Sequence, residues 1–223
     1  MPVPSTHGQP TRPPALPGAG WFATPAGQTL LDSELASVHA ALAERPGQPW
    51  LWLAPGVPDE APAPGQGLRL QAAADGWAGS LRCARPLPLA NESVAAVVLQ
   101  HAVGNAEQLR LLVEECARVL VPGGRLSLLC LNPLSPWRWR WAGDGPGSSE
   151  PMPWRRRMRM AGLVPEAVSQ GLGPRWGLLP DASLQHGPGV RAAWLLRAEK
   201  RVSPLTPVRT RQPLRIGGGV PAA

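Results

Sequence analysis

The pattern of apolar positions is clearest in the middle of the chain, where two predicted strands flank a helical stripe. The run at 94–99 is apolar without alternation, which is typical of a strand buried on both faces of a parallel sheet, and 125–131 is expected to be a second buried run. Between them, apolar residues recur at helical spacing at Leu109, Leu112, Val113, Cys116 and Leu120. The pattern predicts a strand, a helix and a second strand, with the two strands parallel and joined by a right-handed crossover.

Special residues mark the ends of this predicted helix. Asn105 is a suitable N-cap, and Gln108 lies three residues further on, where its amide can complete a capping box. Pro122 and the two glycines after it follow the last apolar position. They are expected to stop the helix and to turn the chain into the second strand.

The chain before this unit predicts one helix and three strands. Thr24 followed by Pro25 indicates an N-cap with proline at the first helical position. Helical spacing continues at Leu31, Leu35, Val38 and Leu42 until Pro46 and Gly47 end it. We expect this helix to pack on the sheet or to cover a ligand cleft, and we expect strands at 50–54, 67–72 and 81–83. The segment 57–66 has too many prolines for a full crossover helix.

The chain after the central unit predicts a basic helix at 154–161 and two strands, at 163–168 and 193–200, with an insertion at 170–189 between them. Proline and glycine dominate residues 1–20, which favours a disordered leader. Residues 203–223 carry three arginines among prolines and glycines, which favours a basic flexible tail. The predicted folded domain therefore spans 21–202.

Composition narrows the class of protein. A chain of 223 residues with 43% hydrophobic residues can form one domain with a substantial core. The net charge of +7 permits contact with nucleic acid or an anionic membrane, but the arginines are dispersed except near 137–159. The three cysteines lack the paired spacing of metal or redox sites. No apolar run has the length of a signal-peptide core or a membrane span, so we expect a cytoplasmic protein with no transmembrane segment and no metal.

Three phrases of the central unit occur in an order that is typical of one enzyme family. LPLANESV leads into the first predicted strand of the unit, RVLVPGGRL ends the helix, and LNPLSPW follows the second strand. In this respect the chain resembles the class I S-adenosylmethionine-dependent methyltransferases of the type 11, or UbiE-like, group, as a divergent member. The resemblance implies an α/β fold with a doubly wound, mostly parallel, Rossmann-like sheet of seven strands. It also implies S-adenosylmethionine as the cofactor and a small or lipid-like methyl acceptor.

In such a fold, ligands bind beyond the carboxyl ends of the strands, where the strand order reverses. The resemblance calls for a glycine-rich turn after the first strand, but the turn here reads LWLAPGVPD, with Gly56 as its only glycine. It also calls for an acidic residue near the end of the second strand, where this chain has Gln71 to Ala73. These departures indicate degenerate cofactor motifs. The residues expected to contact the cofactor are Ala54, Gly56, Gln71, Leu87, Pro88, Gln100 and His101.

His101 is the candidate catalytic residue, because it follows the strand at 94–99 and a histidine can act as a general base on a hydroxyl or amine. The alternative for His101 is a structural histidine at the rim that bonds backbone. Two alternatives to a methyltransferase remain open at this point. The chain can be a catalytically inactive binding or scaffold protein of the same fold. It can also bind or modify RNA through WRWRW at 137–141, where aromatic and cationic side chains alternate.

Overall fold

The computed structural model describes residues 20–56, 65–73, 76–84, 86–101, 106–140, 148–174 and 190–201. The predicted leader, the predicted tail, the Asn105 cap and most of the proline-rich segment at 57–66 lie outside these ranges. The elements are η1 (Gly20–Ala23), α1 (Pro25–Ala43), β1 (Trp50–Ala54), β2 (Gly67–Ala73), β3 (Gly76–Gly79), β4 (Val94–Gln100), α2 (Ala106–Val119), β5 (Leu120–Leu131), η2 (Pro136–Arg140), α3 (Pro151–Met160), β6 (Leu163–Pro165), β7 (Gln170–Leu172) and β8 (Ala193–Lys200).

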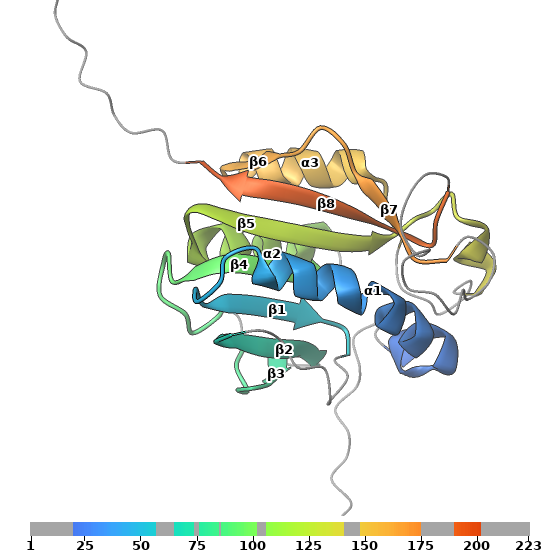
Figure 1. Cartoon of the computed structure of the whole chain (residues 1–223), viewed down its shortest axis with the longest axis horizontal. Helices are drawn as coiled ribbons and strands as arrows, with labels where there is room; N and C mark the ends of the chain where they lie inside the picture. Colours follow the sequence, from blue (N-terminus) through green and yellow to red (C-terminus); the bar gives the residue numbers. More distant parts are fainter. Residues whose placement is uncertain are drawn as a thin grey trace, which may run out of the picture.

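One mixed sheet organises the molecule, with the strand order β3-β2-β1-β4-β5-β8-β6 and the short β7 paired to β8 (Figure 1). The strands β2, β1, β4 and β5 are parallel neighbours. β3 runs antiparallel to β2, and β8 runs antiparallel to both β5 and β6. The predicted α/β, doubly wound, Rossmann-like class is confirmed, and the chain order of the strands reverses between β1 and β4.

The central strand, helix and strand unit is confirmed, except that Leu120, the last residue of the predicted helical stripe, begins β5. β4 is buried at every position, and Val97 lies opposite Leu126 in a parallel ladder. The prediction differs from the structure after α2, because β5 begins at Leu120 and includes the proline and glycines that were expected to form a separate turn. Gly123 has a φ of +75°, and the ladder register shifts between Val94 and Ala96. The proline and glycine turn is thus an irregularity within the start of the strand.

Side-chain alternation along β1 and β4 divides the core into two layers. On one face, Trp50, Trp52, Ala96 and Val98 pack against Val38 and Leu42 of α1. On the other face, Leu51, Leu53, Val97 and Leu99 pack against residues of α2 and α3 such as Val113 and Trp154. Figure 1 shows α1 in front of the sheet and α2 and α3 behind it. Because helices cover both faces, β1 and β4 are buried at every position and are apolar except at Gln100.

Local sequence explains why α1 begins where it does. Thr24 has extended backbone dihedrals, and its Oγ1 accepts a hydrogen bond of 3.3 Å from the amide of Gly27. Pro25 occupies the first turn, where its missing N–H has no intrahelical partner to lose. The helix ends at Ala43, three residues before the predicted stop at Pro46.

Two predicted strands and one predicted insertion need correction. The third strand is Gly76–Gly79, and the predicted strand at 81–83 contributes only an isolated bridge between Cys83 and Trp77. The predicted strand at 163–168 is shortened to β6, because the guanidinium of Arg155 in α3 binds the carbonyl oxygens of Glu166 and Ala167. The predicted insertion at 170–189 opens with β7. The expected strands at 50–54 and 193–200 match β1 and β8.

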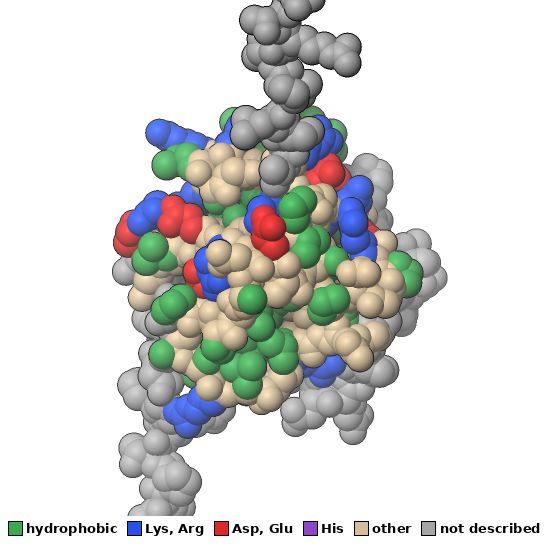
Figure 2. All heavy atoms as spheres, turned by 90° about the vertical axis from the view of Figure 1, so that its left-hand side faces the viewer, with side chains coloured by type: hydrophobic (Ala, Val, Ile, Leu, Met, Phe, Trp, Pro, Cys, Tyr) green, Lys and Arg blue, Asp and Glu red, His purple; other side chains and the backbone are tan. Residues whose placement is uncertain are grey.

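The face at the amino ends of the parallel strands carries charges of both signs. Figure 2 shows Lys and Arg side chains interspersed with Asp and Glu around apolar surface on this face. Two ion pairs contribute, Arg125 with Glu44 at 3.1 Å and Lys200 with Glu92 at 3.2 Å. Among the described residues, this face therefore has no continuous basic surface of the kind that polyanion binding favours. Among the described helices, none has the length and hydropathy needed to cross a bilayer.

Candidate functional site

Five of the seven predicted cofactor residues converge at the carboxyl edge of the sheet. Ala54 ends β1 and lies opposite Gln71 of β2, and Gln100 ends β4 beside it. Gly56 follows β1 by two residues, and His101 follows β4 directly. Gln71 is exposed, whereas Ala54, Gln100 and His101 are buried. The edge where the strand order reverses therefore combines an accessible amide with a buried polar group of side chains.

The buried polar side chains form one hydrogen-bonded cluster around Glu34 of α1. Gln100 donates through Nε2 to Glu34 Oε2 at 2.8 Å, and Trp52 Nε1 donates to Gln100 Oε1 at 3.1 Å. His101 Nε2 lies 2.8 Å from Glu34 Oε2 and 3.0 Å from Oε1. The relative exposures are 0% for Glu34, 1% for Gln100 and 4% for His101. An ionisable pair buried to this extent is rare unless it is hydrogen-bonded, and here Glu34 accepts from Gln100 and lies within hydrogen-bond distance of His101 Nε2.

A left-handed backbone turn places His101 in this cluster. Successive residues of a strand point to opposite faces, so Gln100 and His101 would be expected to diverge. His101 instead has a φ of +47°, and its side chain and that of Gln100 both reach Glu34. Its amide still donates to Leu129 O at 2.8 Å. Non-glycine residues with positive φ are uncommon, and they are concentrated at functional sites.

The η1 segment covers the cluster. The Phe22 ring stacks on the His101 imidazole with centroids 4.9 Å apart, and Gln28 donates to Phe22 O at 2.6 Å. Gly27 makes this approach possible, because a Cβ there would lie 2.4 Å from Trp21 O. Phe22 is 1% exposed. The cluster is therefore shielded from water on the α1 side of the sheet.

Trp52 is held in place from both sides. His39 meets its ring edge-on at 6.3 Å, and the guanidinium of Arg69 lies 5.0 Å from its ring centroid. Burial, and to a smaller extent the positive charge of Arg69, lowers the pKa of His39. The indole is thereby fixed in the orientation from which it donates to Gln100.

The other two predicted cofactor residues, Leu87 and Pro88, lie on the α2 face of the sheet. The Leu87 amide donates to Glu115 Oε2 at 3.1 Å, and the Leu87 carbonyl accepts from Arg118 at 3.1 Å. The hydrogen bond from Arg118 is the main cause that lowers the pKa of Glu115. Leu87 is buried and Pro88 is exposed. The structure thus separates these two residues from the group around His101, and their contact with a cofactor stays a prediction.

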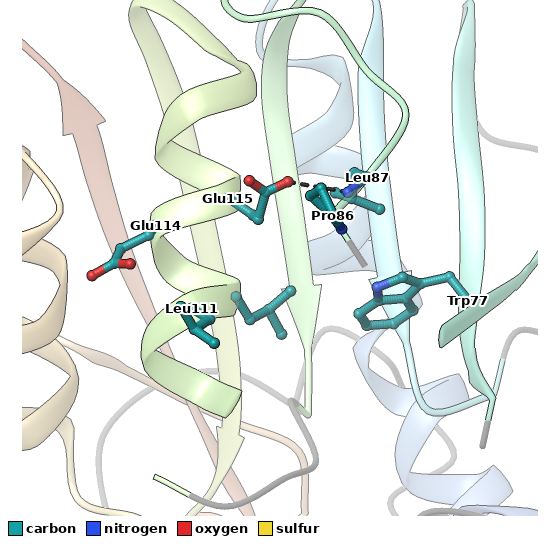
Figure 3. A pocket seen from close by; sticks show the side chains of 7 residues that line it. Trp77, Pro86, Leu87, Leu111, Glu114 and Glu115 are labelled. Atoms are coloured by element: carbon teal, nitrogen blue, oxygen red, sulfur yellow. Dashed lines mark hydrogen bonds between the residues drawn. The ribbon is translucent and has the colours of Figure 1, made fainter. Parts of the chain in front are cut away.

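Leu87 also lines a pocket of about 310 Å³ between α2 and the β2–β3 hairpin (Figure 3). Trp77 faces the pocket from β3, and Leu111 and Glu114 reach it from α2. The volume is at the lower end of the range for small-molecule sites. The pocket is mainly apolar, so it could accommodate only a small apolar or aromatic group.

Sequence reasoning missed Glu34, which is the centre of the buried cluster. A signal was present, because Glu34 lies four residues after Leu30 and four before Val38, both of which are fully buried on α1. A carboxylate within the apolar face of a helix needs a buried partner. Among the described residues, no group of three or more His, Cys, Asp and Glu side chains could hold a metal ion.

Comparison with known proteins shows what the central unit and the fold are similar to. Residues 71–128 match the family model described as Methyltransferase domain. No curated protein matches the sequence. A SAM-dependent methyltransferase of Thermotoga maritima is similar in structure, with a TM-score of 0.53, 18% identity, and coverage of 82% of this chain and 94% of the other. A SAM-dependent methyltransferase of Archaeoglobus fulgidus gives a TM-score of 0.56 and 11% identity, with coverage of 78% and 96%.

The chain that binds the Trm112 methyltransferase activator of Haloferax volcanii has a TM-score of 0.56 and 16% identity, with coverage of 84% of this chain and 99% of that one. At these identities the solved structures establish the fold, and the family model adds the sequence match over the central unit. The strand order, with β8 inserted antiparallel between β5 and β6, is typical of the same fold. The fold is therefore that of the class I S-adenosylmethionine-dependent methyltransferases, and residues 71–128 are similar in sequence to the methyltransferase domain family, for which S-adenosylmethionine is the cofactor.

Proposed function

We propose that this protein transfers the methyl group of S-adenosylmethionine to a small or lipid-like acceptor at the carboxyl edge of β1 and β4. The observation that carries the proposal is the convergence of Gln71, Gln100 and His101 at the edge where the strand order reverses. That edge is where open α/β sheets bind their ligands. The match of residues 71–128 to the methyltransferase domain model supports the same cofactor and the same class of reaction.

The residues at this edge fit the cofactor by a modified set of contacts. A Cβ built on Gly56 would meet no atom closer than Gln28 Nε2 at 4.0 Å, so a ligand can approach the backbone there. Gln71 is exposed beside Ala54 and can bond a hydroxyl through its amide. Gly56 and Gln71 would therefore hold the cofactor. The bound cofactor supplies an electrophilic methyl group, whose bond to sulfur breaks as a lone pair of the acceptor attacks carbon.

His101 is the proposed general base, and it would take up the proton that an amine or hydroxyl acceptor loses. General bases of this kind contribute about 10²- to 10⁴-fold to a rate. Orientation of the acceptor contributes independently of proton transfer. Loss of His101 should therefore lower the rate of methyl transfer more than it lowers the affinity for the cofactor.

Isothermal titration calorimetry with S-adenosylmethionine and with S-adenosylhomocysteine tests the proposal. Wild-type protein should bind both compounds, and Gly56→Phe should abolish binding by filling the space beside the backbone. Val168→Phe is the matched control, because Val168 is 77% exposed and lies beyond β6 at the far edge of the sheet. Absence of heat with the wild-type protein at millimolar cofactor would leave the alternative of an inactive scaffold protein.

One surface feature favours a second candidate function. Trp139 in η2 is 75% exposed, and the guanidinium of Arg138 lies 5.0 Å from its ring centroid. An exposed indole beside a cation is suited to stacking on single-stranded RNA. Binding of a single-stranded RNA oligonucleotide that weakens steeply with salt and is lost in Trp139→Ala would support this function. Unchanged binding in the variant would contradict it.

A further inference from the structure

The indole of Trp52 fixes the orientation of the Gln100 side chain. An indole nitrogen is a donor only, so the Gln100 atom at 3.1 Å from Trp52 Nε1 must be the carbonyl oxygen Oε1. The opposite orientation would bring an N–H of the amide against the N–H of the indole. Both groups are buried, so water cannot relieve such a conflict. The amide nitrogen of Gln100 therefore faces Glu34.

This orientation determines the direction of the next two hydrogen bonds. Gln100 Nε2 donates to Glu34 Oε2, and an ionised carboxylate only accepts hydrogen bonds. The group that faces both carboxylate oxygens from the other side is Nε2 of His101, at 2.8 and 3.0 Å. With the carboxylate as acceptor, this imidazole nitrogen must carry the proton. The hydrogen bonds from the Trp52 indole to the Gln100 amide and from that amide to the Glu34 carboxylate all donate in the same direction, and we call this series the relay. The carboxylate then determines the tautomer of His101.

The other imidazole nitrogen has no protein partner. Within the described residues, His101 Nδ1 is buried and makes no hydrogen bond. Buried polar atoms nearly always have a partner, and an exception needs an explanation such as a catalytic role. We propose that Glu34 is a positioning residue that holds His101 as the Nε2–H tautomer, which leaves the Nδ1 lone pair as the proton acceptor for the substrate.

The proposal deepens the proposed function and rests on it, because it assigns the atom that accepts the proton and limits the substrate class. A lone pair on Nδ1 suits an acceptor with an N–H or O–H, and it offers nothing to a thioether. As the methyl carbon bonds to the acceptor nitrogen or oxygen and its bond to sulfur breaks, the acceptor proton passes to Nδ1. The resulting imidazolium faces the carboxylate of Glu34, which stabilises its charge, and Phe22 excludes water from the ring face.

Nitrogen-15 NMR of the imidazole side chains tests the relay without any turnover. In the wild-type protein at pH 8, His101 should show a protonated Nε2 and an unprotonated Nδ1, assigned with His101→Gln. In the isosteric variant Glu34→Gln, one of the two oxygens that face His101 Nε2 becomes an N–H donor, so His101 should no longer be held as the Nε2–H tautomer alone. Gln100 still points its N–H at residue 34, so the oxygen of the new amide faces Gln100 and the new N–H takes the place of Oε1.

Each outcome supports or overturns the relay. A protonated Nδ1 or an imidazolium in the wild type would overturn it, and so would a tautomer that does not change in Glu34→Gln. If Glu34→Gln does not fold, the wild-type spectrum alone still decides. Calorimetry with S-adenosylmethionine distinguishes failure of the relay from failure of the proposed function. If His101 has the predicted tautomer but the protein does not bind the cofactor, the relay is supported and the proposed methyl transfer is contradicted.

Discussion

Substitution of Gly27 by alanine should destabilise the protein, although the same change in the interior of a helix usually stabilises it. Helix propensity alone predicts a gain of about 0.5 to 1 kcal/mol in the free energy of unfolding. The structure predicts the opposite sign. The new Cβ would lie 2.4 Å from Trp21 O and 2.5 Å from the Cα of Phe22. Both atoms belong to backbone, so the contact cannot be relieved by rotation of a side chain.

The magnitude follows from what η1 loses when it moves away. Burial of a phenylalanine contributes about 1.5 to 3 kcal/mol, and Phe22 is 1% exposed. The hydrogen bond from Gln28 to Phe22 O adds about 0.5 to 1.5 kcal/mol. A partial loss of both, offset by the gain in helix propensity, gives a net destabilisation of about 1 to 3 kcal/mol.

Urea unfolding followed by circular dichroism measures this free energy. Gly20→Ala is the matched control, because a Cβ at Gly20 meets nothing within 4 Å, and its change should stay within about 0.5 kcal/mol. The resonances of His101 should also shift in Gly27→Ala as the Phe22 ring leaves its face. A Gly27→Ala protein that is as stable as the wild type, with unchanged His101 resonances, would refute the close packing of η1 on α1.

Three further changes have directions that the structure fixes. Iodoacetamide at pH 8 should label Cys83 before Cys116 and Cys130 in the native protein. Burial raises the pKa of the Cys116 thiol to about 12 and also raises the pKa of the Cys130 thiol. Mass spectrometry that finds either buried thiol labelled first would contradict this expectation. The pKa of Glu115 is held below its ordinary value of 4.5 chiefly by Arg118. The stability advantage of the wild type over Glu115→Gln should therefore be largest at neutral pH and shrink as pH falls below 4.5. Urea unfolding across this pH range measures the difference in stability, and a constant difference would count against the ion pair. Trp52→Phe leaves the buried oxygen of Gln100 without its donor and should cost about 1 to 3 kcal/mol, whereas an unchanged unfolding midpoint would show that the amide finds another partner.

The parts of the fold that could be predicted are those where periodicity and end signals agree. β4 and the second half of β5 were predictable because both lie between helix-covered faces and are mainly apolar and buried. α1 was predictable because Thr24 and Pro25 mark its start. β3 was missed because it is short and has glycines at both ends, with φ values of +148° and +143° that no apolar pattern signals.

The candidate site could be predicted only in part, because sequence places residues along a strand and gives no distance between helix and sheet. The positions of Gln100 and His101 at the end of β4 followed from the strand alone. Their partner did not, since Glu34 is separated from Gln100 by 66 residues and reaches it only because α1 packs across β4. The turn at His101 was equally hidden, because nothing in a run of apolar residues predicts a positive φ at its end.

The degenerate cofactor motifs and the buried cluster have a common physical interpretation. The turn after β1 lacks most of the glycines that the family pattern calls for, and an exposed Gln71 stands near the place expected for an acid. A charged group is still supplied to the same edge, but by the helix before β1, through Glu34. A neutral amide at Gln71 forms weaker hydrogen bonds with hydroxyl groups than a carboxylate does. Under the proposed function, reduced affinity for the cofactor at Gln71 would be compatible with a fixed proton acceptor at His101, because Glu34 contacts His101 and Gln71 lies on a different strand.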